Sequence, residues 1–243
     1  MATLVTAFMT NINDIDFRSY EKYIELGKKL LCQPIPTVCF LEKHIYDKYF
    51  HSNLQNFPYT TFLTTEKRDI YLFSFESELV NYHVNTDNPT KDTPGYMFVQ
   101  CYKTEWVRRA IETNPYNTSD FIWIDFGIFH MIDNSMEFAL KLDSMCRKTY
   151  PRVRIASCVN PNQENDHDIY STISWFFAGS IFGGNSQYLV QFAKQMKEIC
   201  IDIIINKKRI MWEVNIWYLL YQKHPGLFSP YFANHDITIL KNY

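Results

Sequence analysis

The stretch that most constrains the fold is Phe121–His130, which reads Phe-Ile-Trp-Ile-Asp-Phe-Gly-Ile-Phe-His. Four apolar residues typical of a buried strand lead directly into Asp125, and Gly127 follows soon after. A short apolar run bounded in this way predicts a central strand of an α/β sheet. Because open α/β sheets bind their ligands at the carboxyl ends of strands, Asp125 is a candidate ligand-binding residue.

Asp125 has a second interpretation, which the sequence leaves open. Aspartate is common in turns, where its side chain accepts hydrogen bonds from nearby backbone amides. Asp125 would then cap the turn after the strand and play no part in binding. A position deep in the apolar layer would be unfavourable unless the carboxylate were paired or metal-bound.

Composition and charge limit the classes of protein to which this chain can belong. The 243 residues are 47% hydrophobic and 17% aromatic, enough for one substantial core, and no repeat or interdomain linker is visible. The net charge of -2 is made of interspersed charges, so we expect no nucleic-acid partner. We also expect no signal peptide and no transmembrane segment, because the first residues lack a basic region and no apolar run reaches about 18 residues. Six scattered cysteines without a Cys-x-x-Cys pair indicate reduced thiols and a cytoplasmic protein.

The first third of the chain predicts a β-α-β opening. Short apolar runs with β-branched residues predict the strands, and apolar residues near helical spacing predict the helix between them. In order, we predict a strand at Thr3–Met9, a polar loop at Thr10–Asn13, a helix capped by Ser19 that ends at Leu31, a strand at Thr37–Leu41, a short strand at Tyr59–Leu63 and a weak helix at Ile70–Tyr82.

A polar, turn-rich segment, Asn85–Gly95, precedes a predicted helix at Tyr96–Thr113. Loops of this kind collect binding residues when they lie near a ligand site. The helix carries Lys103 and leads into the strand that ends at Asp125. A lysine on a helix is usually a solvated surface charge, which is the alternative to a role at the site.

The second half of the chain contains an unusual glycine-rich segment, Trp175–Gly184. It places three glycines among large aromatic residues, and glycine in a strand often marks close approach by a ligand or another backbone. Farther on, Glu213 falls in the first turn of a predicted helix, where the helix dipole favours an acid without any catalytic role. The remaining predicted elements are a helix at Ser135–Tyr150, a strand at Val153–Cys158, a helix at Asn185–Ile205, a helix from Trp212 and apolar segments at Phe228–Tyr231 and Ile237–Leu240.

Several motifs together resemble one family of proteins. They are Tyr96-Met97 with Lys103 and Trp106-Val107, Asn114-Pro115-Tyr116 with Ser119, the strand that ends in Asp125-Phe126-Gly127, the segment Phe176–Gly184, and Glu213-Val214-Asn215-Ile216-Trp217. This pattern resembles the HtrL/YibB family of glycosyltransferase-like proteins over most of the chain. More distantly, the layout is similar to glycogenin-like transferases, in which an Asp-x-Asp motif ends a central strand, a preceding helix supplies a lysine and a late histidine completes a metal site.

The resemblance implies a fold and an activity. The fold class would be α/β, a single GT-A-like and Rossmann-like domain whose central sheet is mixed, mostly parallel and flanked by helices. The domain would span residues 1–243, with a nucleotide-binding half over about 1–130 and a sugar- and acceptor-binding half over about 131–243. The implied enzyme is a metal-dependent glycosyltransferase, for hexosyl or pentosyl groups. It would move the sugar from a UDP- or GDP-sugar donor to a glycan or glycoprotein acceptor.

The resemblance also implies roles for individual residues. A divalent metal, manganese first and magnesium second, would be held by Asp125 and His235, because such ions accept carboxylate oxygen and imidazole nitrogen. By bridging phosphate oxygens, the metal would offset the charge that develops on the leaving diphosphate. Glu213 would be catalytic, either orienting a sugar hydroxyl or accepting the acceptor's proton if the enzyme inverts. Nucleotide-sugar binding would involve Thr6, Ala7, Phe8, Lys103, Trp123, Ile124 and Asp125, and sugar or acceptor binding Ala178, Gly179, Ser180 and Glu213.

One position departs from the Asp-x-Asp motif. Trp123 stands where the motif has its first carboxylate, and the HtrL/YibB pattern shares this single aspartate. The single carboxylate favours the alternative of a catalytically weak or inactive nucleotide-sugar-binding protein of the same fold. The joint presence of Lys103, Glu213 and His235 favours an active enzyme. A nucleotidyltransferase is a third hypothesis, but Thr6–Asn13 lacks the glycine-rich phosphate loop expected after the first strand.

Overall fold

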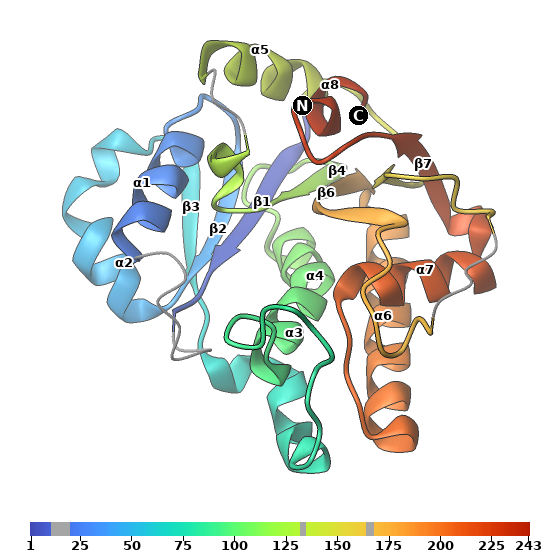
Figure 1. Ribbon diagram of the computed structural model, residues 1–243. Helices are drawn as coiled ribbons and strands as arrows, with labels where there is room; N and C mark the ends of the chain where they lie inside the picture. Colours follow the sequence, from blue (N-terminus) through green and yellow to red (C-terminus); the bar gives the residue numbers. More distant parts are fainter. Residues whose placement is uncertain (11–19, 132–134, 164–167) are drawn as a thin grey trace.

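The computed structural model describes residues 1–10, 20–131, 135–163 and 168–243 (Figure 1). The predicted cap Ser19 and most of the predicted loop Thr10–Asn13 lie outside the described residues. In the part of the chain that is described, no helix combines the length and the apolar character that crossing a membrane requires.

In these residues seven strands form one sheet, in the order β3-β2-β1-β4-β6-β5-β7. Neighbouring strands are parallel except at β6, which runs antiparallel to both β4 and β5. The strands are β1 (Thr3–Phe8), β2 (Thr37–Leu41), β3 (Thr60–Thr64), β4 (Asp120–Ile124), β5 (Val153–Ser157), β6 (Phe177–Asn185) and β7 (Phe228–Phe232).

Helices cover both faces of this sheet. α3, α4, α6 and α7 contribute to the core on one face, and α1, α5 and α8 to the core on the other. Figure 1 shows α1 and α2 on the β3 side of the molecule and α6 and α7 on the β7 side. The helices are α1 (Tyr20–Leu31), α2 (Lys43–Tyr49), α3 (Pro94–Cys101), α4 (Lys103–Thr113), α5 (Ser135–Cys146), α6 (Ser186–Lys207), α7 (Glu213–Lys223) and α8 (Thr238–Lys241). The predicted fold class is confirmed: one α/β domain with a mixed, mostly parallel sheet flanked by helices.

Successive side chains of the central strands contribute alternately to the cores on the two faces of the sheet. On β4, Trp123 packs into the core with α4 and α6, whereas Ile122 and Ile124 pack into the core with α1 and α5. Successive side chains of a strand point to opposite faces, so a strand covered on both faces needs apolar residues at every position. This requirement is why β4 appears in the sequence as an unbroken apolar run.

Two predicted elements differ from the structure in an informative way. The predicted helix at Tyr96–Thr113 is two helices, α3 and α4, separated at Tyr102, whose ψ of -6° departs from the helical value. The break makes Lys103 the first residue of α4. The glycine-rich segment, for which no strand was predicted, contains β6 between β4 and β5, because tertiary packing outweighs strand propensity there.

Candidate functional site

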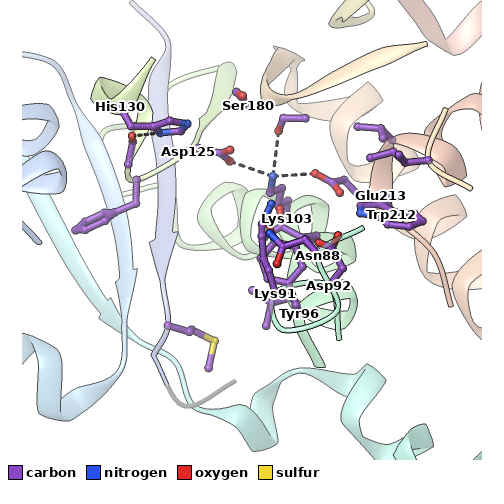
Figure 2. A pocket seen from close by; sticks show the side chains of 18 of the residues that line it. Asn88, Lys91, Asp92, Tyr96, Lys103, Asp125, His130, Ser180, Trp212 and Glu213 are labelled. Atoms are coloured by element: carbon purple, nitrogen blue, oxygen red, sulfur yellow. Dashed lines mark hydrogen bonds and ion pairs between the residues drawn. The ribbon is translucent and has the colours of Figure 1, made fainter. Parts of the chain in front are cut away.

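A cavity of about 690 Å³ opens at the carboxyl ends of β1 and β4 (Figure 2). Its walls come from segments that are far apart in the sequence. They include the end of β1, the start of α1, the loop before α3 and α3 itself, the first turns of α4 and α7, the turn after β4, the chain before β6 with the start of β6, and the segment near His235. This edge of the sheet is where α/β folds of this type bind ligands.

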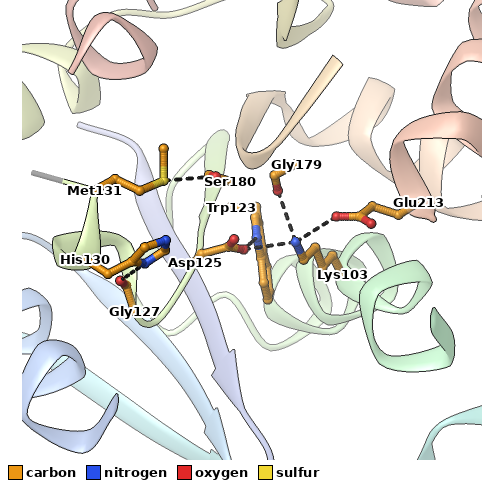
Figure 3. Close-up of polar contacts among 9 residues, drawn as sticks. All are labelled: Lys103, Trp123, Asp125, Gly127, His130, Met131, Gly179, Ser180 and Glu213. Atoms are coloured by element: carbon orange, nitrogen blue, oxygen red, sulfur yellow. Dashed lines mark hydrogen bonds and ion pairs between the residues drawn. The ribbon is translucent and has the colours of Figure 1, made fainter. Parts of the chain in front are cut away.

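Lys103 lies at the centre of a charged cluster in the cavity wall (Figure 3). Its Nζ is 2.9 Å from Oε1 of Glu213 and 3.0 Å from Oδ1 of Asp125. The same ammonium donates to the carbonyl oxygen of Gly179 at 3.1 Å. Only 5% of the Lys103 side chain is exposed, so Lys103 is not the solvated surface charge that a lysine on a helix usually is.

The carboxylates determine the charge state of Lys103. Burial alone would lower the pKa of Lys103, but the adjacent carboxylates of Asp125 and Glu213 outweigh burial, and the pKa is raised. Lys103 therefore remains a cation. In formal charges the cluster contains two carboxylates and one ammonium, so an anionic diphosphate would meet a net negative wall unless another cation accompanied it.

Trp123 orients Asp125. The indole ring lies between Trp106 and Phe182, stacked at centroid distances of 5.8 Å and 6.4 Å. Held in this way, its Nε1 donates to Oδ1 of Asp125 at 2.8 Å. Trp123, which stands where the Asp-x-Asp motif has its first aspartate, thus fixes the orientation of Asp125, which corresponds to the second.

The carboxylate of Asp125 faces the cavity cluster instead of capping the turn. The turn after β4 is closed by backbone groups, because the amide of Ile128 donates to the carbonyl of Asp125 at 3.0 Å. The contacts with Lys103 and Trp123 both fall on Oδ1. Among the described residues no hydrogen bond reaches Oδ2, and 32% of the side chain is exposed, so Oδ2 can accept a ligand.

The glycine at position 179 is required by Glu213. A Cβ at Gly179 would lie 2.3 Å from Oε1 of Glu213, closer than any real contact. The close approach predicted for this segment is therefore made by the Glu213 carboxylate. Asn215, in the same first turn of α7, anchors the chain that precedes β6: its Oδ1 accepts from the amide of Ser174 and its Nδ2 donates to the carbonyl of Thr172.

The cavity brings together most of the residues predicted for the site. Those that line it are Ala7, Phe8, Lys103, Trp123, Asp125, Gly179, Ser180, Glu213 and His235. Three others, Thr6, Ile124 and Ala178, are fully buried in the sheet and are absent from the lining described for the cavity. The roles assigned to all of these residues stay predictions.

Other lining residues had no role predicted from the sequence. Asn88, Lys91 and Asp92 come from the polar segment that was expected to collect binding residues, and Tyr96 follows on α3. Figure 2 shows these side chains grouped below Lys103. His130 also lines the cavity, although it ends the very stretch from which the strand was predicted. The polarity of the segment indicated the first three residues, whereas His130, six residues beyond the end of β4, had no such signal in the sequence.

The donor chemistry of the cavity fits a divalent cation bound together with a substrate. Asp125 offers Oδ2, and His235 lines the same cavity, where its ring packs edge-on against Trp175 at 4.8 Å. Burial lowers the pKa of His235, partly opposed by Asp236, so the imidazole is neutral at pH 7, as metal ligation requires. Within the described ranges no group of three or more His, Cys, Asp or Glu side chains could hold a metal ion. A cation would therefore need phosphate or water oxygens as further ligands.

Comparison with protein families gives one match. The family model described as "Bacterial protein of unknown function (HtrL_YibB)" matches residues 72–235, more than half of the chain. This match confirms the family predicted from the motifs. No curated protein sequence matches the chain.

Solved structures give several distant matches. Mouse xyloside xylosyltransferase 1 in its apo form has a TM-score of 0.46 and 10% identity, with 94% of this chain and 84% of that chain covered. The inositol-1-phosphate CTP transferase from T. maritima has a TM-score of 0.43 and 8% identity, with 96% and 85% covered. The 4-diphosphocytidyl-2C-methyl-D-erythritol synthase from Anaerococcus prevotii has a TM-score of 0.42 and 6% identity, with 96% and 86% covered. At these identities and TM-scores the similarity says nothing about activity.

Proposed function

The chain belongs to the HtrL_YibB family, and from its site we propose that it is a glycosyltransferase that uses a nucleoside-diphosphate sugar and a divalent cation. The observation that carries the proposal is the contact of Lys103 with both Asp125 and Glu213. These three charged groups lie in the wall of a large cavity at the carboxyl edge of the sheet. Burying a lysine together with two carboxylates costs desolvation free energy. Buried charged groups of this kind are concentrated at functional sites.

The proposed donor occupies the cavity with its nucleotide toward β1. Phe8 stacks on Phe126 at 5.0 Å and on Tyr23 at 5.7 Å, and all three residues contribute to the lining of the cavity. Aromatic rings of this kind bind the flat face of a nucleobase without selecting one base. The diphosphate would then lie toward Lys103, whose ammonium supplies a compact positive charge for phosphate oxygens.

Asp125 and His235 would hold the cation. When bound, a divalent cation bridges phosphate oxygens and offsets negative charge on the leaving diphosphate. The formal charge of the cluster supports this requirement, because two carboxylates face a single ammonium. Trp123 contributes by fixing the orientation of Asp125, and Lys103 by occupying Oδ1 so that Oδ2 is directed to the ligand.

Glu213 would act on the sugar side of the reaction. Transfer breaks the bond between the sugar's anomeric carbon and the diphosphate oxygen and forms a bond to the acceptor hydroxyl oxygen. In an inverting reaction the proton of the acceptor hydroxyl passes to a carboxylate that acts as a general base. Glu213 supplies a carboxylate on the α7 side of the cavity. Gly179 and Ser180 line the cavity on the same side, where the donor sugar would lie.

Donor hydrolysis tests the proposal, because water can replace an unknown acceptor. Purified protein would be incubated with a panel of UDP- and GDP-sugars and manganese, and released nucleoside diphosphate would be measured. We expect release from at least one donor, abolished in Glu213→Gln and retained in Asp143→Asn, a surface carboxylate of α5. Saturable donor binding with no release would contradict transfer and support the binding-protein alternative, whereas release of pyrophosphate from a nucleoside triphosphate would indicate nucleotidyl transfer.

A further inference from the structure

His130 and Asp125 project from one tight turn after β4. The amide of Ile128 donates to the carbonyl of Asp125 and the amide of His130 donates to the carbonyl of Gly127, both at 3.0 Å. These two bonds hold the segment from Asp125 to His130 as a turn followed by the short 3-10 helix Ile128–His130. The two side chains therefore have a fixed relation to each other and to the cavity that both line.

The tautomer of His130 follows from its hydrogen bond. Nδ1 of His130 lies 2.6 Å from the carbonyl oxygen of Gly127. A carbonyl oxygen can only accept, so Nδ1 carries the proton and Nε2 of the neutral ring carries a lone pair. Figures 2 and 3 both show the ring beside Asp125, with this second nitrogen on the side of the Asp125 carboxylate.

This arrangement is the one that a metal-binding histidine requires. Metal-ligating histidines almost always donate their other ring N–H to a carboxylate, a backbone carbonyl or water, which fixes the tautomer and the orientation of the ring. From these observations we propose that Nε2 of His130 is a protein ligand of the divalent cation held by Asp125. The inference rests on the proposed function and makes His130, in place of His235, the histidine ligand that accompanies Asp125.

The contacts of the two cavity histidines differ. Nε2 of His235 is 3.6 Å from Sγ of Cys158 and its ring packs edge-on against Trp175. His130 is a solvent-exposed residue, and the one hydrogen bond of its ring to another described residue is made through Nδ1. His130 therefore provides an uncommitted nitrogen next to an uncommitted carboxylate oxygen.

His130 also accounts for the missing first carboxylate of the strand motif. Trp123 is buried among aromatic rings and offers no metal ligand, so the strand itself supplies only Asp125. A histidine on the next turn restores a second protein ligand on the same element. One carboxylate oxygen and one imidazole nitrogen, completed by phosphate and water oxygens, suit manganese, which accepts both donor types.

Manganese binding in the presence of UDP or GDP tests the assignment without turnover. Calorimetry would compare wild type with His130→Ala, with His130→Gln, which removes the imidazole but keeps a polar side chain, and with the remote control His224→Ala. We expect manganese affinity to fall about 10- to 100-fold in both His130 variants and to stay unchanged in the control. Metal-free nucleotide affinity should be the same in all four proteins. An equal loss of metal-free nucleotide affinity would show direct contact with the nucleotide and would overturn the assignment.

Electron spin resonance of bound manganese identifies the ligand directly. The wild-type complex should show hyperfine coupling to an imidazole nitrogen, and this coupling should disappear in His130→Gln and persist in His224→Ala. Coupling that persists in His130→Gln and disappears in His235→Ala would overturn the role of His130 while leaving the proposed function intact. A wild-type protein that binds no manganese with any nucleotide would contradict the proposed metal dependence itself.

Discussion

Lys103 and Glu213, 110 positions apart in the sequence, meet in the cavity wall with 2.9 Å between Nζ and Oε1. Each is almost fully buried, with 5% and 8% of the side chain exposed. Their contact joins the first turn of α4 to the first turn of α7 and fixes the two sides of the proposed donor site relative to each other.

Removing the ammonium should destabilise the fold. Lys103→Met leaves the Glu213 carboxylate buried without its partner, and such a change costs about 3–5 kcal/mol of unfolding free energy. The double variant Lys103→Met/Glu213→Gln should lose less than the sum of the two single variants, because it leaves no unpaired buried charge. Urea unfolding of the four proteins measures this coupling.

A matched surface lysine provides the control. Lys43 pairs with Asp47 on the exposed side of α2, so Lys43→Met should change the unfolding free energy by no more than about 1 kcal/mol. Strict additivity of the Lys103 and Glu213 variants would contradict the described contact.

Position 179 should not tolerate a side chain. The Cβ of Gly179→Ala would collide with the Glu213 carboxylate, so we expect a loss of about 1–3 kcal/mol, as is usual for overpacking. Gly226→Ala is the matched control, because nothing lies within 4 Å of the Cβ it would add. Its effect should stay within about 0.5 kcal/mol. Thermal or urea unfolding of both variants checks the difference, and equal effects would count against the placement of Glu213.

Local patterns in the sequence predicted the parts of the site that depend on one element. The apolar run before Asp125 predicted β4 and the strand-end position of the carboxylate. The polarity of Asn85–Gly95 predicted that the loop before α3 would contribute to binding, and Asn88, Lys91 and Asp92 from it line the cavity.

Contacts between distant elements could not be predicted in this way. Nothing in the spacing around Lys103 or Glu213 indicates that their helices converge, because that depends on the sheet order and on the break at Tyr102 that begins α4 at Lys103. The stacking of Trp123 between Trp106 and Phe182, which orients Asp125, likewise requires three elements to be packed first. The strand β6 was obscured because its glycines serve close packing and not strand propensity: Gly179 packs against Glu213, Gly183 against Phe121 and Tyr243, and Gly184 against Arg152.

The stability of the fold should depend on the protonation of His235. Its pKa is lowered in the folded state, chiefly by burial and against the opposing effect of Asp236, whereas in the unfolded chain it lies near about 6.5. Below that pH the unfolded chain binds the proton more readily, so stability should fall as the pH drops from about 6.5 toward the folded pKa. His235→Gln should show a shallower fall in unfolding free energy over this range. Identical pH profiles for the two proteins would mean that His235 is not desolvated in the fold.

The most direct test of the account is the binding of a nucleoside diphosphate to Asp125→Asn, measured by calorimetry with and without manganese. Asparagine keeps an oxygen that can accept from Trp123 and Lys103 but removes the charge that a cation requires. We predict that manganese strengthens binding to wild type and to the surface variant Asp143→Asn. In Asp125→Asn it should give no strengthening, while the unfolding midpoint stays close to that of wild type. Equal manganese-dependent affinity in Asp125→Asn and wild type would contradict the assignment of this cavity as a metal-dependent nucleotide-sugar site.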